Sequence, residues 1–72
     1  MKFIITATPI SPHTRRRTGK ARTEVIDTKA SEWSDTVFGK VSTVSEMEIC
    51  YERFYKLIKM DVKVVDVRMV PS

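Results

Sequence analysis

Several residue types that carry particular functions are scarce in this 72-residue chain. A single cysteine excludes an intramolecular disulfide, and one cysteine with one histidine excludes the common zinc-binding boxes. The chain is too short for two independently folded units, so we expect one domain spanning residues 1–72. A single core of this size contributes only about 3–5 kcal/mol of net stability, so partners or a homodimer would help to hold it.

Long hydrophobic runs are also missing. The apolar stretch over residues 3–10 is interrupted by Thr6, Thr8 and Pro9, and it is too short and too polar for a membrane span or a signal peptide. We therefore expect a cytoplasmic protein without membrane contact. The carboxylates are too scattered to specify a catalytic pair or a metal site, so the sequence predicts no enzyme, no cofactor and no metal.

Positive charge is present and concentrated in one segment. The net charge is +4, and Arg15, Arg16, Arg17, Lys20 and Arg22 follow one another with no acid between them. Outside this segment, eight basic residues stand against nine acidic ones. A solubilising surface intersperses both signs, whereas a local cluster is typical of a surface that binds an anionic partner. We interpret these five residues as the contact site.

Two strands are predicted around this segment. Residues 2–10 are rich in β-branched types, with Phe3, Ile5 and Ala7 on one face. Pro9 and Pro12 remove backbone donors near the end of this strand, so it should stop there or lie at a sheet edge. Residues 20–28 form the second strand, in which Glu24 and Ile26 share a face. The pair makes a hairpin with an arginine-rich tip, and Gly19 is the expected place for a positive φ.

Residues 31–43 allow two interpretations. The composition of residues 36–41 favours a short third strand. A short helix that ends at Gly39 and pairs Trp33 with Val37 is the alternative.

A helix over residues 46–60 is the clearest element. Ser45 and Glu48 have the spacing of a capping box. Apolar residues recur at helical spacing and predict one buried stripe: Met47, Cys50, Tyr51, Phe54, Leu57 and Ile58.

Residues 62–70 then form a strand with valine on both faces, with Val65, Val67 and Met69 on one and Val62, Val64 and Val70 on the other. Such a strand is usually central in its sheet. The fold class is α+β: a small antiparallel sheet, made of the hairpin, the short third strand and the C-terminal strand, with one helix packed on one face.

Three further residues are candidate accessory contacts. His13 lies among the arginines, Tyr55 lies at the edge of the helical stripe, and Trp33 is either a lid on the core or an exposed anchor. The basic segment contains no aromatic residue, which argues against a stacking platform for single strands within it.

The chain resembles the small accessory proteins of bacteriophages and other mobile elements, including anti-CRISPR proteins. The features concerned are its size, the opening Met1-Lys2-Phe3-Ile4-Ile5 strand, the α+β layout and the isolated basic tip. The resemblance implies a non-enzymatic inhibitor that blocks or redirects a host protein or ribonucleoprotein complex that processes nucleic acid. Direct binding of DNA or RNA with little sequence specificity is the alternative.

Overall fold

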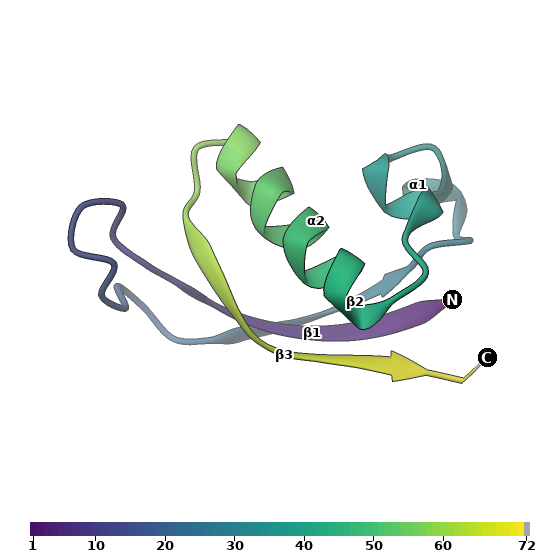
Figure 1. The fold of residues 1–72 in the computed structure, drawn as a ribbon, viewed down its shortest axis with the longest axis horizontal. Coiled ribbons are helices and arrows are strands. Elements are labelled where there is room, and N and C mark those ends of the chain that lie inside the picture. The colour runs from purple at the N-terminus through teal and green to yellow at the C-terminus, as the bar shows by residue number, and fades with distance from the viewer. Residues whose placement is uncertain (72) are drawn as a thin grey trace.

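A three-stranded antiparallel sheet with one helix across one face forms the body of the protein (Figure 1). This arrangement comes from a computed structural model that describes residues 1–71, and it confirms the α+β class. The elements in chain order are β1 (Lys2–Pro9), β2 (Arg22–Asp27), α1 (Ser31–Ser34), the 3-10 helix η1 (Val37–Lys40), α2 (Val44–Leu57) and β3 (Val62–Val70).

The central strand is β1, because the sheet order is β2-β1-β3. The prediction that residues 62–70 form a central strand is therefore wrong. The side chains of Phe3 and Ile5 on β1 are fully buried and face α2, where Met47 is also fully buried. A strand bonded on both sides places these side chains in the middle of the core.

A bulge explains why β3 has valine on both of its predicted faces. Thr6 of β1 lies opposite Asp66, but the next residue, Ala7, lies opposite Val64, so Val65 has no partner. This extra residue brings Val64 and Val67 onto the same side of the sheet, because they oppose Ala7 and Ile5, which share a face. Val64 is buried, whereas Val65 is 53% exposed.

Residues 31–43 contain no strand, so the predicted third strand is wrong. The Thr36 hydroxyl donates to the carbonyl of Trp33 at 2.6 Å and accepts from the N–H of Phe38 at 3.1 Å, which caps η1. Phe38 is fully buried and meets Trp33 edge to face, with ring centroids 5.4 Å apart. The helical alternative is closer, but its pairing of Trp33 with Val37 on one helix is also wrong, because Trp33 lies in α1 and Val37 in η1.

The start of α2 lies two residues before the predicted start. Thr43, rather than Ser45, is the N-cap: its hydroxyl accepts from the N–H of Glu46 at 3.1 Å. The Glu46 carboxylate in turn accepts from the N–H of Ser42 at 3.4 Å. The prediction that Ser45 and Glu48 form the capping box is therefore wrong, because Thr43 and Glu46 form it.

The end of α2 is also earlier than predicted. Lys59 has a positive φ of 63°, and the N–H of Met60 donates to the carbonyl of Tyr55 at 2.9 Å, as in a Schellman motif. Leu57 and Ile58 are exposed, at 81% and 52%, so they do not belong to the buried stripe, contrary to the prediction. The remaining stripe residues are buried or half-buried: Met47, Cys50, Tyr51 and Phe54.

Candidate functional site

The basic tip, residues 11–22, is the connection between β1 and β2 together with Arg22, the first residue of β2, and it protrudes at one end of the molecule (Figure 1). The molecule is elongated, with extents of 37 × 21 × 18 Å. Every residue from Pro12 to Arg22 is exposed, so the tip contributes no buried side chain to the core. Its side chains are accessible to a partner.

Backbone hydrogen bonds give the basic tip a defined shape. The N–H of Ser11 donates to the carbonyl of Arg16 at 2.8 Å, and the N–H of Arg15 donates to the carbonyl of Ser11 at 2.8 Å. Arg15 has a φ of 59°, whereas Gly19 has no positive φ. The expectation for Gly19 is therefore wrong: the chain reverses at Arg15, and the left-handed residue lies at that turn.

The five cations of the tip lie in two groups, one at its turn and one at its base. Arg15 and Arg16 lie at the turn, while Lys20 and Arg22 line a cavity at the base of the tip. Arg17 lies between them, and its Nε donates to the hydroxyl of Thr8 at 3.3 Å. Arg17 thus has an anchoring contact as well as a charge.

None of these five cations forms an ion pair with residues 1–71. The two ion pairs of the described chain join the Met1 amine to Asp27 and Arg68 to Asp66, both outside the tip. The positive charge of the tip is therefore not neutralised by a direct carboxylate partner within this part of the chain.

The accessory residues predicted from the sequence do not all lie together. His13 is exposed in the tip, and Tyr55 lines the same cavity as Lys20 and Arg22. Trp33 belongs to α1 at the opposite end of the molecule, where it packs against Phe38. The structure supports a role of Trp33 as a lid on the core and separates it from the tip.

The cavity at the base of the tip has a volume of about 430 Å³. Its lining residues come from the C-terminal half of α2, the end of β1, the tip and the starts of β2 and β3. Its wall is apolar and aromatic with two cations, and its lining residues include Lys20, Arg22, Tyr51, Tyr55, Met60 and Val62.

A carboxylate fixes the two tyrosines of this cavity. Their hydroxyls both donate to Oε1 of Glu24, at 2.9 Å from Tyr51 and 3.1 Å from Tyr55. Burial, with smaller contributions from the neighbouring Tyr55 and Glu24, raises the pKa of Tyr51 above its ordinary value. The phenol of Tyr51 therefore stays protonated at neutral pH and keeps its donor.

Sequence reasoning did not assign Tyr51 and Glu24 to the site. One signal was available: Glu24 shares a face of β2 with the buried Ile26, and a carboxylate on a core face needs hydrogen-bond donors. The donors come from a helix that is 27 and 31 residues away in sequence. Only the tertiary structure shows that they are these tyrosines.

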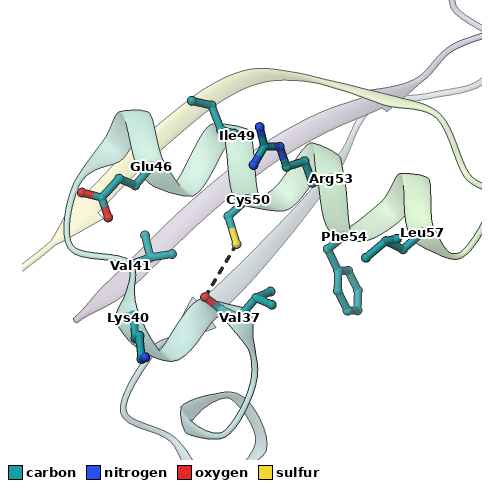
Figure 2. A pocket seen from close by; sticks show the side chains of 9 residues that line it. All are labelled: Val37, Lys40, Val41, Glu46, Ile49, Cys50, Arg53, Phe54 and Leu57. Carbon is teal, nitrogen blue, oxygen red and sulfur yellow. Dashed lines mark hydrogen bonds between the residues drawn. The ribbon is translucent and has the colours of Figure 1, made fainter.

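A second hollow, between α2 and η1, has a different character (Figure 2). Its volume is about 420 Å³, and its wall is largely apolar, with Ile49 and Leu57 from α2 and Val37 from η1. Cys50 faces it and donates weakly to the carbonyl of Val37 at 3.7 Å. Burial raises the pKa of the Cys50 thiol, an effect that Arg53 partly offsets, so the thiolate is disfavoured.

Comparisons with known proteins identified no family model, curated protein or solved structure that matches the chain. No helix within residues 1–71 is long and apolar enough to cross a bilayer. In the same residues, no group of three or more His, Cys, Asp and Glu side chains is placed to hold a metal ion.

Proposed function

We propose that this protein is a non-enzymatic binding protein that docks its basic tip onto the nucleic acid of a host nucleic-acid-processing complex in the cytoplasm. The observation that carries the proposal is the exposure of five cations, without a carboxylate partner in residues 1–71, on one protruding loop. Binding would be stoichiometric, and it would block or redirect the complex, as the resemblance to anti-CRISPR-type proteins implies.

Arginine suits this role because its planar guanidinium donates to two phosphate oxygens at once. Arg15 and Arg16 have no side-chain hydrogen bond within the described residues, so their donors are available. The hydrogen bonds across the turn restrict the backbone, and a restricted loop loses less entropy when a partner binds.

The size of the tip limits what it can do alone. About four phosphate contacts give a log–log salt slope near −3.6 on duplex DNA, or roughly a hundred-fold loss of affinity between about 50 and about 200 mM salt. Phosphate contacts also carry little sequence information. We therefore expect weak binding to naked nucleic acid and tight binding only where a host complex adds further contact surface.

The first experiment measures binding of a fluorescent DNA duplex over a range of salt concentrations. The Arg15→Ala/Arg16→Ala variant should reduce the magnitude of the salt slope by about 1.8, because two contacts are lost. Lys40→Ala/Arg53→Ala is the matched control, since it removes two exposed cations away from the tip and should leave the slope unchanged. Equal slopes for all three proteins would show that the tip does not contact phosphates.

The second experiment addresses the host complex. Tagged protein should capture a complex from the lysate of its native host, and nuclease treatment or the Arg15→Ala/Arg16→Ala substitutions should abolish capture. Capture that survives both changes would point to a protein contact elsewhere. Submicromolar binding to naked nucleic acid at physiological salt would instead favour the direct-binding alternative.

A further inference from the structure

We propose that the cavity at the base of the basic tip receives one unstacked nucleobase of the bound nucleic acid. This inference rests on the proposed function and adds a specific ligand class to it, a nucleotide within a single-stranded segment. It assigns a role to Tyr55, Lys20 and Arg22, which the cavity brings together from α2 and from the β2 side of the hairpin.

The dimensions and the wall of the cavity fit a base. Its volume of about 430 Å³ lies in the range of small-molecule sites, about 300–1,000 Å³. Met60 and Val62 contribute apolar surface, and Tyr51 and Tyr55 contribute rings whose centroids are 4.8 Å apart. Every base has a π-face, so stacking on tyrosine does not depend on sequence.

The tyrosines are held in place before a ligand arrives. Both hydroxyls donate to Glu24, which restricts the rotation of the two side chains. Tyr51 is buried, whereas Tyr55 is half-buried and retains accessible ring surface. Tyr55 is therefore the ring on which a base would stack, and Tyr51 supports it.

The charges around the cavity select an anionic ligand with an apolar part. Lys20 and Arg22 are exposed at the cavity and can hold the phosphates that flank the inserted base. Arg15, Arg16 and Arg17 continue the positive surface along the tip toward the next phosphates. A base buried with its phosphates on adjacent cations matches this combination of apolar wall and charged rim.

The aromatic groups absent from the basic segment are thus supplied by α2. The hollow in Figure 2 does not offer this combination, because its two cations, Lys40 and Arg53, share the wall with the exposed carboxylate Glu46. At the base of the tip, the carboxylate Glu24 instead accepts hydrogen bonds from both tyrosines. Since insertion requires an unpaired and unstacked base, the cavity predicts a preference for single strands over duplexes.

The test compares two 12-nucleotide probes with the same number of phosphates, oligo(dT) and an oligomer of abasic sites. Wild-type protein should bind oligo(dT) about tenfold more tightly than the abasic probe, the effect of stacking one base. Tyr55→Ala should remove this difference by weakening oligo(dT) binding alone. Tyr55→Phe is the matched control, because it keeps the ring, and it should retain most of the difference.

A spectroscopic readout avoids dependence on the folding of a variant. A probe whose only base is a single 2-aminopurine, with abasic sites at its other positions, should lose fluorescence on binding to the wild-type protein, because stacking on the tyrosine quenches this base. Trp33 lies at the opposite end of the molecule, so its emission reports whether each variant is folded. Unchanged 2-aminopurine emission in the saturated complex would overturn the base pocket.

The outcomes separate this inference from the proposed function. Equal affinity for both probes, with a salt slope that still depends on Arg15 and Arg16, would reject the pocket and retain the phosphate-binding tip. Equal loss of affinity for both probes in Tyr55→Ala would also reject the pocket. A salt slope that does not respond to the two arginines would reject the proposed function itself.

Discussion

The two long connections of this protein use their side chains in opposite ways. The basic tip, residues 11–22, holds its shape through backbone hydrogen bonds and buries no side chain between Pro12 and Arg22. The connection from β2 to α2 also has backbone hydrogen bonds, but in addition it buries side chains, with Phe38 fully buried between Trp33 and Phe54. The first connection therefore leaves its side chains free for binding, whereas the second commits them to stability.

The largest expected effect comes from removing the aromatic centre of the second connection. Phe38→Ala should lower the free energy of unfolding by about 3–5 kcal/mol, because the cavity left by the ring is enclosed by the core. In a domain of this size such a loss leaves little folded protein. Urea unfolding followed by circular dichroism measures the effect.

The control for this prediction is the Arg15→Ala/Arg16→Ala variant, whose unfolding free energy should change by less than about 0.5 kcal/mol. A comparable loss in both variants would contradict the division of roles between the two connections, since it would make the tip a structural element.

Alanine substitutions at the two glycines, one in each connection, test the same comparison with a smaller expected loss of unfolding free energy. A methyl group at Gly39 would collide with the backbone carbonyl of Ser34, which cannot move without disrupting α1. Gly39→Ala should therefore cost about 1–3 kcal/mol of unfolding free energy.

At Gly19 the added methyl would lie 3.0 Å from Cγ of Pro9, so the proline ring must shift slightly. Gly19→Ala should cost less than Gly39→Ala when both are measured in the same urea titration. The reverse order would mean that the tip packs as tightly as the aromatic connection.

The smallest expected effect concerns the tyrosine pair. Tyr51→Phe removes one hydrogen bond to Glu24 and should cost about 1 kcal/mol at neutral pH, since Tyr55 still donates to the same carboxylate.

The pH dependence of this effect follows from the raised pKa of Tyr51. The stabilisation is complete below the ordinary tyrosine pKa of 10.0 and declines as the pH rises above it, because the unfolded chain then loses a proton that the folded state retains. The advantage of wild type over Tyr51→Phe should therefore shrink above about pH 10. A constant difference up to about pH 11 would contradict the assignment of the raised pKa to Tyr51.

Much of the fold could be predicted from periodicity. The alternation of Phe3, Ile5 and Ala7 identified the buried face of β1, and the segment Val62–Val70 was predicted with the bounds that β3 has. These signals repeat over several residues, so a single exception does not hide them.

The errors arose where local signals were degenerate or weak. Thr43 with Glu46 and Ser45 with Glu48 both have the spacing of a capping box, and burial of Met47 and Tyr51 does not depend on which pair caps the helix. Residues 36–41 have β-like composition, yet Val37–Lys40 form η1, in which Phe38 is fully buried in the core. Local propensity does not show this tertiary contact. The position of the bulge in β3 likewise depends on its register with β1.

The five cations of the candidate site can be predicted from the sequence, whereas the contribution of its two tyrosines cannot. Five clustered cations need no tertiary information to be recognised. The cavity beside them requires the pairing of Ile5 with Glu24 and the placement of α2 over the sheet. Long-range contacts of this kind leave no periodic signature in the chain.

The pairing of Lys2 with Val70 brings the two ends of the chain onto neighbouring strands, at the end of the molecule away from the basic tip (Figure 1). Neighbouring strands lie about 5 Å apart, so a short peptide linker would join residues 1 and 71 and permit circular permutation. Opening such a closed chain within the tip would cut the loop between β1 and β2 and leave the sheet order β2-β1-β3 unchanged. A permuted protein that folds but no longer binds would assign folding and recognition to separate parts of the sequence.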